Sequence, residues 1–204
     1  MTVLGSLPAG LRDPLLVALN EITTNYRLGK WEASELNGGK LCEIVYTILR
    51  GHVDGKFSAK PSKPGNMVDA CNALAKADRK VFPQSVQITI PRVLIALYEI
   101  RNNRGVGHVG GDVDPNHMDA TFVHAAARWV VAELVRLFHA VDTVTATSLV
   151  DALVERVVPG IWTVGAVKRV LATDLSMTTE FPPLFHPGHT RFASVELART
   201  LLGT

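Results

Sequence analysis

The sequence contains few of the residues that often define a protein class by themselves. It has only two cysteines, Cys42 and Cys71, which lie far apart in apolar helical patterns and therefore predict reduced core thiols. Aromatic residues make up 6% of the 204 residues, and the three tryptophans are not gathered in a basic stretch, so a base-stacking platform is not predicted. The formal net charge of +2 is too small to indicate nucleic-acid binding by charge alone.

Several motifs for catalysis and cofactor binding are also missing. The sequence has no G-x-x-x-x-G-K-[ST] phosphate loop and no G-x-S-x-G nucleophile elbow. The glycines of "GVGHVG" at 105–110 match G-x-G-x-x-G, but they follow a predicted helix instead of a strand, which argues against dinucleotide binding. His117 and His124 lie seven residues apart without a third ligand at local spacing. We therefore expect neither a metal nor another cofactor.

Membrane and export signals are absent as well. The opening "MTVLGSLPAG" lacks the basic and apolar segments of a signal peptide, and no apolar run is long enough to cross a bilayer. Hydrophobic residues make up 47% of the sequence and charged residues 20%, which is typical of a globular protein. The mean hydropathy of +0.18 fits either tight helical packing or a buried dimer face. We expect a soluble, cytoplasmic protein.

Helical periodicity is what the first 141 residues do contain. It predicts five helices, at 11–30, 36–51, 66–82, 85–105 and 116–141, of which the fourth is clearly helical from Pro91 and should end near Asn103. Asn66 is expected to cap the third helix, and Asp114 with Pro115 to begin the fifth. Asp78 falls on the apolar stripe of the third helix, so its buried part should end a turn earlier. The β-branched stretch 86–90 also fits a strand by local propensity.

Residues 142–204 differ in character from the rest of the chain. They predict a short helix from residue 143, a hairpin within 157–171 whose second half also fits a helix, and a last helix capped by Ser194. This order is compatible with a small winged-helix-like unit, which would be incomplete because the sequence stops at Thr204. The predicted fold is thus an all-α helical bundle over 1–141 with a small α/β accessory region over 142–204.

The stretch "RNNRGVGH" at 101–108 is the main candidate for a functional site. Arg101 falls in the last turn of a predicted helix, and His108 lies in the glycine-bearing segment that follows. A guanidinium suits phosphate oxygens, and a histidine can take or give a proton near neutral pH. Together they can break RNA without a metal, but an arginine at a helix end is also explained by the helix dipole.

This stretch resembles the motif of the HEPN superfamily, many of whose members are metal-independent endoribonucleases. In that family the arginine is often followed by an asparagine, and four to six residues separate the arginine from a histidine. Arg101, Asn102 and His108 match this pattern, with six residues between the arginine and the histidine. The wider "EIRNNRGVGHVGG" is similar to the C-terminal domain of abortive-infection phage-defence proteins, from which it departs at Val109. The resemblance extends over about residues 30–140 and implies an antiparallel HEPN-like helical bundle.

The resemblance also implies a role for each matching residue. His108 would be the general acid and base, Arg101 would bind and polarise the scissile phosphate, and Asn102 would position the phosphate or orient the histidine. The ribose 2′-OH would attack the phosphorus, which leaves a 2′,3′-cyclic phosphate and a 5′-hydroxyl. Active family members dimerise so that two such motifs face each other across the twofold axis, and a homodimer is therefore expected.

Residues around the motif are candidates for accessory roles. Asn103, Arg104 and His117 are predicted RNA contacts, although Arg104 also fits a solvated surface position. Glu99 lies two residues before Arg101 on a different helical face, and we interpret it as a surface charge. We expect His117 near the motif because it lies in the first turn of the helix that follows the loop.

The resemblance implies a ribonuclease of a phage-defence or toxin–antitoxin system with RNA as its substrate. A regulatory or antitoxin protein is an expected partner, because an unrestrained ribonuclease is toxic. One alternative is a catalytically silent HEPN scaffold that binds RNA, a nucleotide or a protein. A second alternative is a DNA-binding regulator acting through the C-terminal region, which would need a basic recognition helix. The last predicted helix, "SVELARTLLGT", has one arginine and one glutamate, which argues against it.

Overall fold

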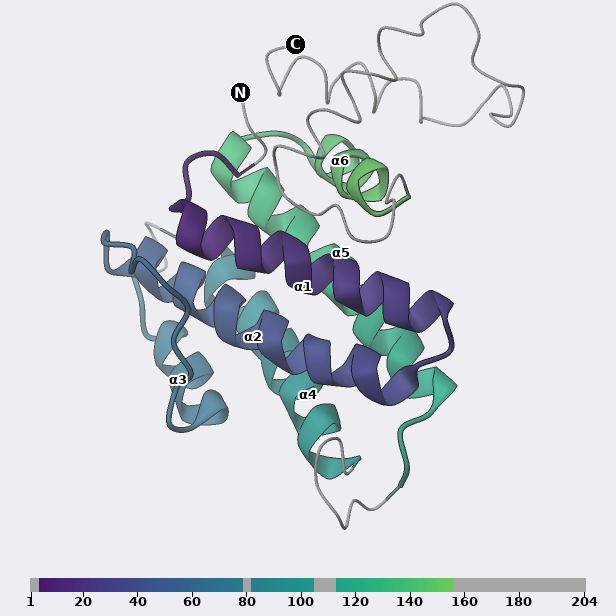
Figure 1. Ribbon diagram of the computed structural model, residues 1–204. Coiled ribbons are helices and arrows are strands. Elements are labelled where there is room, and N and C mark those ends of the chain that lie inside the picture. Colours follow the sequence, from purple (N-terminus) through teal and green to yellow (C-terminus); the bar gives the residue numbers. More distant parts are fainter. Residues whose placement is uncertain (1–3, 79–81, 105–112, 156–204) are drawn as a thin grey trace, which may run out of the picture. The chain divides into compact units, whose positions relative to one another are not determined.

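The computed structural model describes residues 4–78, 82–104 and 113–155, and every regular element in these ranges is helical. The elements are α1 (Ala9–Arg27), α2 (Trp31–Val53), α3 (Met67–Leu74), the π-helical turn η1 (Ser85–Thr89), α4 (Ile90–Asn103), α5 (His117–His139) and α6 (Thr143–Glu155) (Figure 1). The predicted all-α class is therefore confirmed for this part of the chain. The hairpin and last helix that we predicted beyond residue 156 lie outside the described residues.

The chain divides into two compact units, and the division falls inside α5. One unit comprises Leu7–Val130, and the other comprises, among the described residues, 4–6 and 131–155. The boundary that we expected between residues 141 and 142 stays a prediction. All described candidate site residues belong to the unit Leu7–Val130.

Within the unit Leu7–Val130, α1 and α2 lie side by side and run in opposite directions, α2 packs against α4, and α3 packs against α4 (Figure 1). The core consists of apolar side chains at helical spacing, which is the pattern that the sequence predicted. Its largest fully buried members are Leu11, Leu15, Leu19, Ile22, Leu41, Ile48, Leu49, Ile90, Leu94 and Leu97. The apolar stripes thus give each helix one buried face, and the remaining faces carry the polar residues.

Two adjacent glycines in α2 allow its neighbours to come close. A Cβ atom added at Gly38 would lie 2.7 Å from Cγ1 of Val123 in α5, and one added at Gly39 would lie 3.2 Å from Cδ of Arg101 in α4. Glycine inside a helix costs about 1 kcal/mol relative to alanine. At these positions it provides the space that brings Arg101 against the middle of α2.

Several local predictions are confirmed. Oδ1 of Asn66 accepts a hydrogen bond from the backbone N–H of Asp69 (3.1 Å) and caps α3. The buried stripe of α3 ends at Leu74, one turn before Asp78. Pro91 lies in the first turn of α4, the one place in a helix where a proline is well tolerated.

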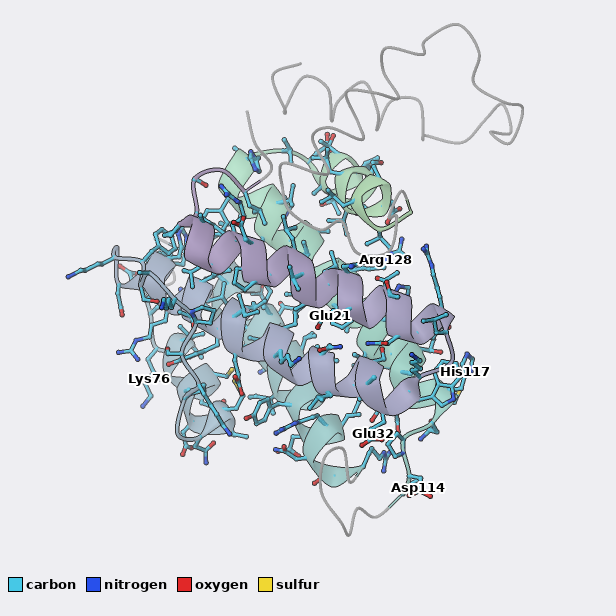
Figure 2. The ribbon with its side chains drawn as sticks, viewed as in Figure 1. Glu21, Glu32, Lys76, Asp114, His117 and Arg128 are labelled. Atoms are coloured by element: carbon cyan, nitrogen blue, oxygen red, sulfur yellow. The ribbon has the colours of Figure 1, made fainter. Side chains whose placement is uncertain are left out.

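Three other predictions are wrong at their boundaries. The stretch 86–90 is not a strand: it winds into η1 and leads directly into α4. Helix α2 begins at Trp31, five residues earlier than the apolar pattern indicated. Helix α5 begins at His117, and its cap is Asn116, whose Oδ1 accepts from the N–H of Asp119 (3.1 Å). Asp114, expected as the cap, lies in the segment that leads into α5 (Figure 2).

The second unit, as far as it is described, is also helical. Leu4 donates its backbone N–H to Nε2 of His139 (2.6 Å), and Oδ1 of Asp142 accepts from the N–H of Thr145 (2.7 Å) at the start of α6. The buried face of α6 consists of Ala146, Leu149, Val150, Leu153 and Val154. Among the described residues of the chain, no helix combines the length and the apolar character that crossing a bilayer requires.

Candidate functional site

The structure places most of the predicted site residues around the C-terminal end of α4. Arg101, Asn102 and Asn103 form its last turn, and Arg104 follows directly. His117 is the first residue of α5. His108 lies in 105–112, outside the described residues, so its approach to Arg101 stays a prediction.

Arg101 is held by contacts along its whole side chain. Its Nη1 donates to Oδ1 of Asn102 (3.1 Å), and its Cζ lies 5.7 Å from the centre of the Tyr98 ring. The hydroxyl of Tyr98 in turn donates to Oε1 of Glu43 in α2 (3.3 Å), which fixes the ring. The aliphatic part of Arg101 lies against Gly39. Arg101 pairs with no carboxylate among the residues that the structure describes, and its side chain is half-exposed.

Arg104 has a different environment. Its Nε donates to Oδ2 of Asp119 (2.7 Å), and Nδ2 of Asn116 donates to the same oxygen (2.6 Å). The side chains of Arg104 and Asp119 are 26% and 16% exposed. This ion pair connects the end of α4 to the first turn of α5, the two described elements that flank residues 105–112. An RNA contact by Arg104 stays a prediction, and its Nε is already used.

Glu35 in α2 is a buried carboxyl beside this ion pair. It is 0% exposed, and neither carboxyl oxygen makes a hydrogen bond of good geometry. Burial raises the pKa of Glu35 from its ordinary value of 4.5 to about 7, and the negative charge of Asp119 adds to that shift. The backbone amide of Asn116 and the charge of Arg104 lie close enough to lower the pKa in part. Glu35 is therefore half-protonated near neutral pH.

His117 belongs to an aromatic cluster where α1, α2 and α5 meet (Figure 2). Its Nε2 lies 3.4 Å from the hydroxyl of Tyr26, and its ring meets Trp31 edge-on with centroids 5.1 Å apart. The Tyr26 ring also stacks on His124 at 4.7 Å. Burial, with help from the charges of Arg128 and Arg27, lowers the pKa of His124 to about 4, so that histidine is neutral.

These contacts explain His117 and His124 as packing residues. Nothing brings a third metal ligand to them, and no group of three or more His, Cys, Asp or Glu side chains that could hold a metal occurs in the described ranges. His117 itself is exposed, and the RNA contact through it stays a prediction.

Sequence reasoning missed Glu35, Asp119 and the glycine pair. Glu35 lies at the same helical spacing as Gly38, Cys42 and Val45, so it falls on the buried stripe of α2. The sequence shows this spacing, but the predicted helix began at residue 36, so Glu35 was not assigned to its buried face. No local sequence pattern predicts the ion pair of Asp119, because its partner Arg104 lies fifteen residues earlier in the chain.

Comparison of the chain with protein-family models, with curated proteins and with solved structures gave no match. The HEPN resemblance therefore stays a prediction from the 101–108 stretch and from the order of the helices in the sequence.

Proposed function

We propose that the chain is a metal-independent endoribonuclease of the HEPN type that belongs to a phage-defence or toxin–antitoxin system. The observation that carries the proposal is the environment of Arg101. The side chain lies at the end of α4, with its aliphatic part against Gly39 and its guanidinium hydrogen-bonded to Oδ1 of Asn102 (3.1 Å). It pairs with no carboxylate among the described residues. A guanidinium held in this way can receive a phosphate without first breaking an ion pair.

The chemistry follows from these groups and from the predicted role of His108. His108 takes the proton of the ribose 2′-OH, and the resulting oxygen attacks the adjacent phosphorus. Arg101 donates hydrogen bonds to the phosphate oxygens on which negative charge develops. The protonated His108 gives its proton to the leaving 5′-oxygen as the P–O5′ bond breaks, so the products are a 2′,3′-cyclic phosphate and a 5′-hydroxyl. Asn102 orients the Arg101 guanidinium through its Oδ1.

The test is RNA cleavage by the purified chain in EDTA, with end-group analysis of the products. The variants are Arg101→Ala and His108→Ala, and Arg92→Ala is the matched control because Arg92 is an exposed arginine in the first turn of the same helix. We expect the wild type and Arg92→Ala to produce 2′,3′-cyclic ends and the other two variants to be silent.

Two results would overturn the proposal. Equal cleavage by all four proteins would place the activity elsewhere or in a contaminant. A wild type that binds but does not cut diverse RNAs would favour the silent scaffold. Far-ultraviolet circular dichroism of each variant shows whether a loss of cleavage reflects a loss of fold.

A homodimer is part of this proposal. Helix α5 carries three large apolar side chains on one exposed face at spacings of four and seven residues: Met118 (76% exposed), Phe122 (44%) and Trp129 (38%). A second copy can cover this stripe by packing α5 against α5. Phe122→Glu should then convert a dimer to a monomer in analytical ultracentrifugation, and an unchanged sedimentation coefficient would contradict the pairing.

Localisation and regulation complete the proposal. A ribonuclease of this kind acts where cellular RNA is, so we place it in the cytoplasm. It also needs a restraining protein or antitoxin in the resting cell. Co-expression with a candidate antitoxin that restores growth, compared with the His108→Ala chain that needs no such rescue, tests this point.

A further inference from the structure

A groove lies beside the Arg101 site, on the side of α4 that faces the start of α3. Its volume is about 310 Å³, at the lower end of the range for small-molecule sites. The residues that matter for its chemistry are Asn66 and Met67 at the start of α3, and Ile95, Tyr98, Glu99 and Asn102 on α4. All of them belong to the unit Leu7–Val130.

The groove is directly connected to Arg101. Asn102 lines the groove and accepts the hydrogen bond from the Arg101 guanidinium (3.1 Å). Tyr98 also lines it, and the centre of its ring is 5.7 Å from Cζ of Arg101. A group bound in the groove is therefore within the length of one nucleotide of a phosphate bound by Arg101.

The groove combines apolar and polar walls. Ile95 and Tyr98 lie three residues apart on α4, and buried Met67 faces them from α3. These side chains suit the flat face of a base. Glu99 supplies a carboxylate that accepts hydrogen bonds, whereas the Asn66 and Asn102 amides can also donate.

We propose that this groove binds the base of the nucleotide next to the scissile phosphate, and that the preferred base is guanine. The inference rests on the proposed ribonuclease function, since it uses the phosphate on Arg101 to place the nucleotide. Guanine presents two neighbouring N–H donors on its Watson–Crick edge, which the two oxygens of the Glu99 carboxylate match. Its O6 and N7 accept hydrogen bonds, which fits an amide donor such as that of Asn102.

The other bases fit the Glu99 carboxylate less well. Adenine and cytosine each offer one exocyclic amino group beside an acceptor nitrogen, and uracil offers one N–H between two carbonyl oxygens. Each of these would set an acceptor against a carboxylate oxygen. The carboxylate also repels phosphate, so it favours the orientation with the base in the groove and the phosphate at Arg101.

The test measures binding without cleavage. The His108→Ala chain is titrated with fluorescein-labelled hexaribonucleotides that have guanine, inosine or adenine at one position in an otherwise all-adenine sequence. Inosine lacks the exocyclic amino group and should lose one of the two hydrogen bonds to Glu99. We expect the guanine oligomer to bind roughly tenfold more tightly than the adenine oligomer, with inosine between them.

A second variant ties the preference to the groove. Adding Glu99→Gln should abolish the preference for guanine, because the carboxamide offers one acceptor and one donor in place of two acceptors and instead matches the amino group and acceptor nitrogen of adenine. The matched control is Glu21→Gln, a half-exposed glutamate of α1 in the same unit (Figure 2), which should keep the preference. Equal binding of the three oligomers by the parent chain, or a preference that survives Glu99→Gln, would overturn the inference.

The outcomes separate this inference from the ribonuclease proposal. A guanine preference that depends on Glu99, in a chain whose wild type cuts no RNA, supports the groove and removes the proposed function. Cleavage that depends on Arg101 and His108 but shows no preference in binding removes the groove and leaves the function. A chain that binds none of the oligomers overturns the inference.

Discussion

Arg101 and Arg104 lie one helical turn apart at the end of α4, and they have different surroundings because they face different helices. Arg104 meets Asp119 of α5 at 2.7 Å in a half-buried ion pair. Arg101 meets a glycine of α2 and an asparagine amide, and no carboxylate of the described ranges pairs with it. The same residue type therefore serves two purposes here: one arginine holds helices together, and the other remains available to a ligand.

The largest expected effect is a difference in RNA cleavage between lysine variants of the two arginines. Arg101→Lys keeps the charge but loses the planar fork that can bind two phosphate oxygens, so RNA cleavage should fall roughly 100-fold or more. Arg104→Lys should leave the cleavage rate within about threefold, because a lysine can still pair with Asp119. Initial rates on one RNA substrate decide this, and equal losses in both variants would remove the distinction.

The next effect concerns stability and pH at Glu35. Its folded pKa of about 7 lies above its ordinary 4.5, so the folded state binds more protons than the unfolded state between these values. The folded chain therefore loses stability as the pH rises from 4.5 to 7, by about 3 kcal/mol in total. Glu35→Gln should remove this loss and unfold at higher urea concentration than the wild type at pH 8.

The groups that face Glu35 set the controls for that measurement. They are Asp119 from α5, Arg104 after α4, and Glu32 on the same helix. His124 titrates in the opposite sense, because its lowered pKa of about 4 makes stability fall as the pH drops through the range from 6.5 to 4. The contribution of His124 is the same in the wild type and in Glu35→Gln, so it cancels when the free energies of unfolding of the two proteins are subtracted at each pH. A difference that is the same at pH 5 and pH 8 would contradict the raised pKa.

A smaller effect is expected from breaking the Arg104 pair. Arg104→Ala leaves Asp119 half-buried beside Glu35 without its cation, which should cost roughly 2 kcal/mol and lower Tm by about 4–8 °C. Arg101→Ala should change Tm by less than about 4 °C, because about zero to 1 kcal/mol is typical for a partly exposed cation. Differential scanning calorimetry of both variants at pH 7.5 gives the comparison, and equal shifts would refute it.

The sequence predicted the helices well because apolar side chains recur at helical spacing in each of them. It predicted the position of Arg101 in the last turn of α4 for the same reason, and it placed Asn66 correctly from the preference of asparagine for helix caps. The periodicity does not specify the helix boundaries. Asp114 and Asn116 are both good caps, and only the hydrogen bonds that Asn116 makes with Asp119 distinguish them.

The surroundings of Arg101 and Arg104 could not be predicted in this way. The Arg104–Asp119 pair and the contact between Gly39 and Arg101 join residues on different helices. Such contacts depend on how the helices are packed, which periodicity does not specify. Glu99 was interpreted as a surface charge, and only the groove formed with the start of α3 gave it a chemical context.

The smallest expected effect concerns the two adjacent glycines of α2, of which Gly39 contacts Arg101 and Gly38 contacts Val123. Gly38→Ala would place its Cβ 2.7 Å from Val123, a β-branched side chain that cannot rotate away easily. The overpacking should outweigh the gain in helix propensity and destabilise the chain by about 1 kcal/mol. Gly39→Ala would meet the flexible Arg101 side chain at 3.2 Å, which can shift by a few tenths of an ångström.

Gly39→Ala should therefore leave the free energy of unfolding within about 0.5 kcal/mol of the wild type, or raise it slightly. The substitution should instead lower the rate of RNA cleavage several-fold, because displacing the aliphatic part of Arg101 also displaces its guanidinium. Urea unfolding and initial rates of both variants measure the two effects. If Gly38→Ala impaired cleavage more than Gly39→Ala at equal stability, the glycine beside Arg101 would not be what positions it.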